Sequence, residues 1–117
     1  MCVQVTTIAG TGVSGFANGA ALAAAFSGPS GLSTDVVGNV LVADRFNNRV
    51  RRIDWVTRQV TTVAGSGAPS TVNGLGLAAS MDRPLSLALF NGLLLVEHAA
   101  GVSLIGMISC IRLISPG

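Results

Sequence analysis

Residues 28–54 read GPSGLSTDVVGNVLVADRFNNRVRRID, and the architecture of the chain follows from them. Segments rich in Val, Ile and Leu alternate here with turns that carry Gly, Asn or Asp, which is typical of short antiparallel strands. Gly38 and Asn39 tolerate the positive φ that a tight turn requires. A similar segment, QVTTVAG, follows at 59–65. We therefore predict one small sheet with strands at residues 31–35, 39–44, 49–54 and 59–64.

The strand NVLVAD at 39–44 carries apolar side chains on both of its faces. An antiparallel sheet with one face in water would alternate apolar and polar residues instead. Both faces of this sheet must therefore be covered, as they are where sheets stack radially in a β-propeller.

An internal repeat surrounds this sheet. The phrase VTTIAGTG at 5–12 returns as VTTVAGSG at 60–67, and aligning residue 5 with residue 60 makes 13 of the 28 positions in 5–32 identical. A fixed period of this kind signals stacked structural units that cannot bury their apolar surfaces alone. We expect the first phrase to form the outermost strand of a preceding unit, over 5–9.

The segment at 11–29 connects that strand to the sheet and has a second copy at 66–84. It begins with glycine-rich turns and continues into an alanine run. Asn18 is a suitable cap for a short helix over 20–26, and Pro29 ends the segment.

These residues resemble the NHL repeat, a propeller blade whose pattern joins Pro-x-Gly, Gly-Asn, Val-Ala-Asp and Asn-x-Arg in that order. The matching positions are Pro29, Gly31, Asp35, Gly38, Asn39, Val42, Ala43, Asp44, Asn48, Arg49, Val50 and Asp54. The resemblance covers residues 5–90. It implies an all-β fold, a partial β-propeller of four-stranded antiparallel blades with a short helix in the connector between blades.

The resemblance divides residues 1–117 into the parts of a single incomplete propeller. These parts are the outer strand of a preceding blade (5–10), a connector with a short helix (11–29), a complete blade (30–65), a second connector (66–84) and a degenerate partial blade (85–114). In the last part NGLLLVE replaces GNVLVAD with a two-residue deletion, and CIRLI at 110–114 echoes RVRRI. Propellers need roughly four to eight blades, so this chain cannot close a ring alone.

Composition limits the possible functions. Half of the residues are hydrophobic and 10% are charged, with a net charge of +2, so surface meant to be covered is expected and nucleic-acid or membrane binding is not implied by charge. Cys2 and Cys110 lie far apart and are interpreted as two unpaired, buried thiols. No secretory signal and no apolar stretch long enough for a bilayer are visible, which favours a soluble intracellular protein and no membrane partner.

The segment DRFNNRVRRIDWVTR at 44–58 carries five of the seven arginines together with two aromatic residues. Basic and aromatic side chains together can hold single-stranded nucleic acid, and some NHL propellers bind RNA. The candidate partner or RNA contacts are Arg45, Arg49, Arg51, Arg58 and Trp55. A structural interpretation stands beside this one, in which Arg49 bonds Asp44 across the turn and exposed arginines deter edge pairing.

Strand parity places Arg49 and Arg51 on one face and Arg52 on the other, where Arg52 must either extend its charged end to solvent or find a carboxylate. Asp35 and Asp44 sit at strand ends, where a propeller enzyme would hold a metal, but turn and capping roles fit them better. Adjacent Glu97 and His98 point to opposite faces of a strand. No catalytic, metal-binding or cofactor-binding residue is therefore predicted.

The function expected from the sequence is a protein-interaction scaffold, with a protein partner or further blades on its open faces. An RNA-binding face built on the 45–58 cluster is the alternative, and a fragment of a metal-dependent propeller hydrolase or lyase is a third interpretation. The chain is more readily understood as a binding protein than as an enzyme. We expect it to self-associate when it is expressed alone.

Overall fold

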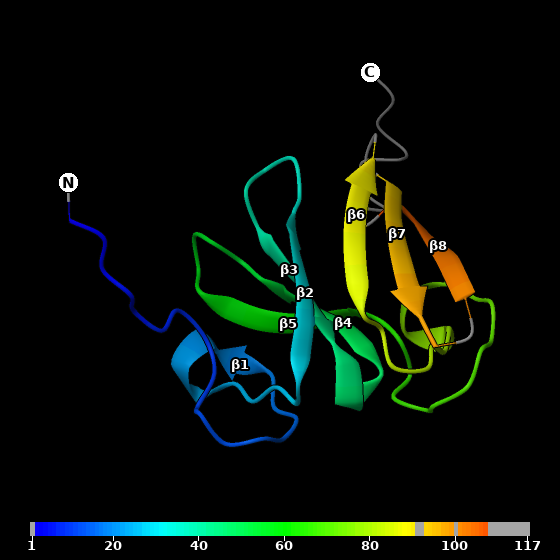
Figure 1. The fold of residues 1–117 in the computed structure, drawn as a ribbon, viewed down its shortest axis with the longest axis horizontal. Coiled ribbons are helices and arrows are strands. Elements are labelled where there is room, and N and C mark those ends of the chain that lie inside the picture. The colour runs from blue at the N-terminus through cyan, green and yellow to red at the C-terminus, as the bar shows by residue number, and fades with distance from the viewer. Residues whose placement is uncertain (1, 91–92, 100, 108–117) are drawn as a thin grey trace.

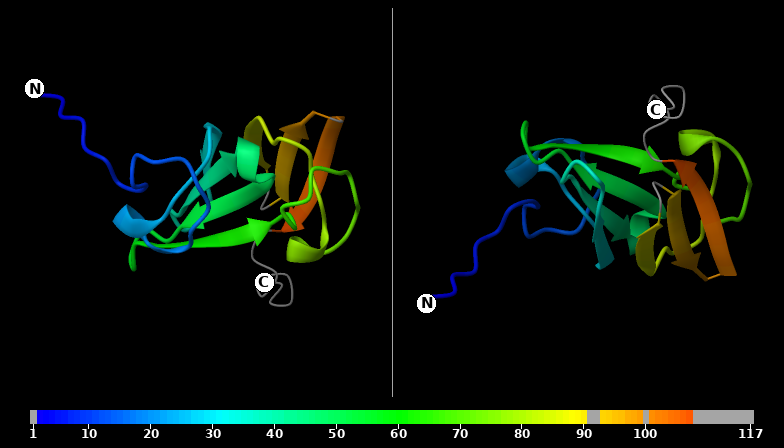
Figure 2. Two further views of the ribbon diagram at one scale, coloured as in Figure 1. Left: turned by 90° about the horizontal axis from the view of Figure 1, so that it is seen from below. Right: turned by 90° about the horizontal axis from the view of Figure 1, so that it is seen from above.

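The computed structural model describes residues 2–90, 93–99 and 101–107, which form two antiparallel sheets (Figure 1). These residues contain no α-helix, so the predicted all-β class is confirmed. The two sheets lie side by side, and the N-terminal segment leaves the first sheet on the side away from the second (Figures 1 and 2). None of the described helices is long and apolar enough to cross a bilayer.

The first sheet has the strand order β1-β5-β4-β3-β2. Its strands are β1 (Gly19–Ala20), β2 (Pro29–Thr34), β3 (Val40–Asp44), β4 (Arg49–Ile53) and β5 (Gln59–Ala64). The last four match the strands predicted from residues 28–65, and each pairs with the next in antiparallel register. A single 3-10 turn, η2 (Arg45–Asn47), joins β3 to β4 and ends at Asn48, whose φ of 54° places it in the left-handed region.

Strand β3 is covered on both faces, as its sequence predicted. Leu41 is buried in one apolar cluster with Val50 of β4 and with Leu94 and Val96 of the second sheet. Its neighbour Val42 is buried in another cluster on the opposite face. That second cluster also holds Ile53, Val60, Ala21 and Ala24. One face of the first sheet therefore packs on the second sheet, and the other lies under the N-terminal connector.

The second sheet has the order β6-β7-β8, with β6 (Ser86–Phe90), β7 (Leu93–His98) and β8 (Gly101–Met107). Strand β2 of the first sheet runs close to the start of β6. A Cβ on Gly31 would lie 2.7 Å from the carbonyl oxygen of Leu85, so this position excludes any larger residue. The predicted CIRLI element at 110–114, which includes Cys110, falls outside the described residues. The prediction that Cys2 is buried is wrong, because it lies in the N-terminal segment that leaves the first sheet and is exposed.

Two local predictions are wrong. Residues 5–9 form no strand, because no strand of the described chain lies beside them to accept their hydrogen bonds. The expected helix over 20–26 is a single 3-10 turn, η1 (Ala21–Ala23). Ala25 instead forms an antiparallel bridge with Ala17, and this extended pairing prevents the alanine run from continuing as a helix.

The repeat in the sequence is also a repeat in the structure. The bridge between Ala17 and Ala25 recurs between Val72 and Ser80, and the turn η1 recurs as η3 (Gly76–Ala78). The two connectors thus adopt one conformation, each leading from a QVTT segment to the first strand of a sheet.

Replacing Leu41 with Asp is expected to unfold the first sheet. The carboxylate would enter the apolar cluster between the sheets without a partner, at a cost of several kcal/mol against a total stability of about 5–15 kcal/mol for a domain. Val56→Asp, at an exposed turn position, is the matched control and should change the free energy of unfolding by about 0.5 kcal/mol or less. Thermal unfolding followed by circular dichroism measures both. A cooperative transition of wild-type midpoint in Leu41→Asp would contradict the double coverage of β3.

Candidate functional site

The side chain of Arg51 in β4 is completely buried, and it lies at the centre of the polar contacts in the first sheet. Its Nη1 donates to Asp44 Oδ2 (2.6 Å) and to the carbonyl of Ala25 (2.8 Å). Nη2 donates to the carbonyl of Ala17 (2.7 Å) and to Asn18 Oδ1 (2.9 Å), and Nε also reaches Asn18 Oδ1 (3.3 Å). A guanidinium has five N–H groups, so these five bonds account for all of them.

Asp44 is the buried counter-charge of Arg51. Its Oδ2 also accepts from Asn47 Nδ2 (2.7 Å), and its Oδ1 accepts from the backbone N–H of Ser27 (2.7 Å). The expectation that Arg49 holds this carboxylate is wrong. Arg49 faces Asp44 in the register, but its guanidinium turns away and donates to the carbonyl of Ser66 (3.2 Å), while Arg51 reaches Asp44 diagonally on the same face.

Two aromatic rings enclose the Arg51 guanidinium. Its Cζ lies 4.6 Å from the ring centroid of Phe16 and 4.7 Å from that of Phe26. Burial lowers the pKa of Arg51 from its ordinary value, and the bond to Asp44 opposes this change. An arginine stays protonated in proteins, so the site holds a buried ion pair. The group fastens the connector to the sheet and has no free donor for a ligand.

The structure separates the other predicted contact residues. Arg45 lies beside Phe46 at the β3–β4 end of the sheet (5.1 Å from Cζ to the centroid). Arg58 and Trp55 lie in the β4–β5 turn at the opposite end of β4, and they stack with the Arg58 Cζ 3.7 Å from the Trp55 ring centroid. Arg51, expected among the contacts, is enclosed by the connector and reaches no surface. The 45–58 cluster is thus not one continuous basic face.

The β4–β5 turn presents Trp55 with 43% of its surface exposed. Asp54 shapes this turn, because its Oδ1 accepts hydrogen bonds from the backbone N–H groups of Val56 (3.0 Å) and Thr57 (2.9 Å). The bond from Thr57 lowers the pKa of the Asp54 carboxyl below its usual value. Arg52 finds a carboxylate here, as parity predicted, with Nη2 3.8 Å from Asp54 Oδ2.

The remaining predicted polar groups have local partners. Asp35 Oδ1 accepts from the N–H of Val37 (3.0 Å) and of Asn39 (2.9 Å), which confirms its predicted role in the turn. Glu97 is exposed and accepts from the Ser86 hydroxyl (2.9 Å), whereas His98 is buried, so these neighbours do face opposite ways. In the described part of the chain, no three His, Cys, Asp or Glu side chains converge as metal ligands.

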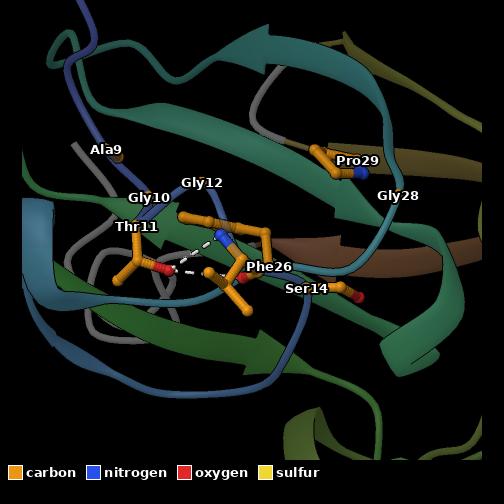
Figure 3. Close-up of a pocket in the computed structure, with 9 residues that line it drawn as sticks. Ala9, Gly10, Thr11, Gly12, Ser14, Phe26, Gly28 and Pro29 are labelled. Atoms are coloured by element: carbon orange, nitrogen blue, oxygen red, sulfur yellow. Dashed lines mark hydrogen bonds between the residues drawn. The ribbon is translucent and has the colours of Figure 1, made fainter.

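Two concave surfaces of the first sheet are uncharged. One is a pocket of about 320 Å³ that opens beside the first glycine loop (Figure 3). It is lined by Ala9, Gly10, Thr11, Gly12, Val13, Ser14, Phe26, Gly28 and Pro29. Within it Thr11 Oγ1 accepts from the N–H of Val13 (3.1 Å).

The other is an adjoining groove of about 170 Å³ on the face of the first sheet that carries Val42. It is lined by Ile8, Ala9, Phe26, Pro29, Leu32, Val40, Val42 and Ile53. Leu32 leaves 68% of its surface exposed there. The groove therefore suits an apolar protein surface rather than a charged ligand.

The closure of the connector over Arg51 was not evident from the sequence. The available signal was strand parity, which puts Asp44 and Arg51 on one face. The other acceptors of Arg51 were not predictable, because they come from connector residues 26 to 34 positions away.

No protein-family profile matches the chain. It is 41% identical over 64 residues to the protein SUPPRESSOR OF QUENCHING 1, chloroplastic, of Arabidopsis thaliana, covering 54% of this chain and 6% of that protein. The fold is similar to a Bacteroides thetaiotaomicron protein of unknown function, with a TM-score of 0.75 and 26% identity over 82% of this chain and 25% of that one.

A second similar structure is an auxiliary nutrient binding protein from Bacteroides ovatus, with a TM-score of 0.56 and 17% identity over 79% of this chain and 26% of that one. This likeness concerns the fold alone. The chain spans 6% of the similar plant protein and about a quarter of each similar solved chain.

Arg51→Ala is expected to destabilise the chain by about 3–5 kcal/mol, because it leaves the Asp44 charge buried without a partner. Arg51→Lys should lose less, since it keeps the charge but not the fork of five donors. Arg58→Ala, which removes an exposed arginine from the same hairpin, serves as the control. Urea unfolding measures all three variants. Equal stability of Arg51→Lys and wild type, together with equal losses for both alanine variants, would contradict the proposed role of Arg51.

The Asp54 turn should loosen only in acid. Since the folded-state pKa lies below the ordinary 3.8, its contribution to stability is present above that value and is lost as the pH falls through the folded pKa. The amide NMR signals of Val56 and Thr57 are expected to shift together with a midpoint below 3.8. Asp54→Asn should abolish the transition. A midpoint above 3.8 would contradict the hydrogen-bonded turn.

Proposed function

We propose that the chain is a section of an NHL-type β-propeller that acts as a protein-interaction scaffold. The observation that carries the proposal is the coverage of β3, whose neighbouring residues Leu41 and Val42 lie in different apolar clusters. The second sheet packs on the cluster that holds Leu41. Consecutive blades of a propeller pack in this way, face against face around a centre.

The groove on the other face is where a further sheet would bind. There Leu32 is exposed and Val40 partly exposed above the buried Val42, so the connector covers this apolar face only in part. An apolar surface of this kind is typical of an interaction site. The partner is a further blade or a protein with a similar apolar face. The similarity to about a quarter of a longer solved chain supports a piece of a larger assembly.

RNA contact is a weaker alternative, favoured by the exposed stack of Trp55 and Arg58. An exposed ring beside a guanidinium can stack on an unpaired base. Two observations weigh against a strong site: Arg51 is buried, and Arg45 lies at the far end of β4. No observation on the described residues favours the hydrolase or lyase interpretation.

Leu32→Asp tests the scaffold. Sedimentation of the full chain is expected to show self-association that this variant weakens by about tenfold or more, because it places a charge in the apolar groove. Val56→Asp, also exposed, should associate as the wild type does. A wild-type chain that stays monomeric with a sharp unfolding transition would contradict the proposal.

The RNA alternative is tested with a single-stranded RNA in a fluorescence anisotropy titration. Binding through a few arginines should fall steeply between about 50 and 200 mM salt. Salt-sensitive binding that Trp55→Ala removes, by a chain that does not self-associate, would favour RNA over the scaffold.

A further inference from the structure

We propose that residues 4–9 of one copy form the fourth strand of the second sheet of a neighbouring copy, hydrogen-bonded along β8. This inference rests on the proposed function, because it treats the two sheets as consecutive blades. It adds the occupant of a specific sheet edge and the segment that fills it.

The first observation is that nearly the same sequence occurs twice, once as a paired strand and once without a partner strand in the described chain. QVTTIAG at 4–10 and QVTTVAG at 59–65 differ at one residue. The segment at 59–65 contains β5, which is paired along β4. The segment at 4–10 pairs with no strand of the described chain, and 94% of the Val5 surface is exposed. A segment with the composition of a paired strand therefore lies in solvent.

The second observation is that the two segments end in the same backbone conformation and the same hydrogen bond. Gly10 has a φ of 104° and Gly65 a φ of 99°. The N–H of Gly10 donates to the carbonyl of Ala21 (2.9 Å), and the N–H of Gly65 donates to that of Gly76 (3.2 Å). Residues 4–9 thus join the connector at 11–29 in the same way as β5 joins the connector at 66–84. They are therefore positioned to belong to a sheet that precedes the first.

The third observation concerns the outer edge of the second sheet. In the first sheet β5 lies outside β4, whereas among the described residues β8 pairs only with β7. An edge strand presents unpaired N–H and C=O groups that can pair with another chain. In the described part of the chain, no strand stands beside β8 in the place of β5, whose sequence residues 4–9 repeat.

Residues 4–9 do not reach β8 of their own copy. The two segments lie at opposite ends of the molecule in both figures, and its longest extent is 40 Å (Figures 1 and 2). Six residues in a strand span about 20 Å. The pairing that we propose is therefore between two copies.

The register follows from the repeat. In the first sheet Ala43 faces Val50, and Val50 faces Ala64. Leu87 repeats Leu32, so its strand partner Val96 stands in the place of Val42, the partner of Leu32. Glu97 then stands in the place of Ala43 and pairs with Val102. Ala9 holds the place in QVTTIAG that Ala64 holds in QVTTVAG. The junction between copies therefore places Ala9 of one copy opposite Val102 of the next.

The same junction brings the second sheet of one copy onto the Leu32 groove of the next. The connector that follows residues 4–9 leads to the first sheet, as the connector after β5 leads to the second. The contact between copies then repeats the contact within one copy. Head-to-tail association of this kind closes into a ring if the rotation from copy to copy closes, and otherwise extends into a filament. Two sheets per copy give rings of about two to four copies.

The test uses Thr6→Pro/Thr7→Pro in the full chain. Successive residues of an edge strand point their N–H groups to opposite sides, so one of these two prolines removes a bond to β8 whichever side faces it. Val3→Pro, outside the pairing segment, is the matched control. Sedimentation is expected to show at least about tenfold weaker assembly for the double variant. The control should assemble as the wild type does.

Because residues 4–9 pair with no strand of the described chain, the double variant should keep the thermal midpoint of the monomer. A second measurement uses Ala9→Cys and Val102→Cys on a background without Cys2 and Cys110. Mixed and oxidised, the two single variants should form a covalent dimer, and Val56→Cys mixed with Val102→Cys should not.

The outcomes separate the two proposals. Assembly that survives the prolines but is lost in Leu32→Asp overturns strand exchange and leaves the scaffold standing. Assembly unaffected by Leu32→Asp overturns the scaffold. A wild-type monomer with no disulfide between mixed variants overturns both, and is the result expected if each chain fills its own β8 edge.

Discussion

The buried ion pair of Arg51 and Asp44 holds the first sheet and its connector together. Transferring two charges from water into a protein interior is costly, and the attraction between them offsets that cost only if their other hydrogen-bonding groups are satisfied. Here Arg51 finds five bonds and Asp44 three. Because several of these partners lie in residues 17–27, folding of the sheet requires the connector to close over it.

The second sheet lacks this arrangement. The positions that correspond to Asp44 and Arg51 are occupied by His98 and Ser103, since Val96 pairs with Leu87 and Ser103 as Val42 pairs with Leu32 and Arg51. Its connector is attached through Asn48 instead. Asn48 accepts from the N–H of Arg83 (2.8 Å) and donates to the carbonyl of Gly67 (3.3 Å). An asparagine tolerates the left-handed conformation that this double contact requires.

This use of polar residues explains why the arginine-rich segment is a poor guide to function. Several of the groups that looked suited to phosphate are bonded to carbonyls, carboxylates and aromatic rings of the same chain. The apolar groove around Leu32, by contrast, stays exposed on the first sheet. Its chemistry favours contact with another protein surface, which supports the scaffold proposal.

The four long strands of the first sheet, the double coverage of β3 and the repeat of the connector could all be predicted from the amino-acid sequence. Strand length, turn chemistry and the distribution of apolar residues are local properties, so they are visible in neighbours along the chain. The state of residues 5–9, the partner of Asp44 and the conformation of the alanine run were settled by tertiary contacts. A strand exists only where another strand accepts its hydrogen bonds, and a buried charge pairs with whichever side chain reaches it, so these outcomes depended on residues distant in sequence.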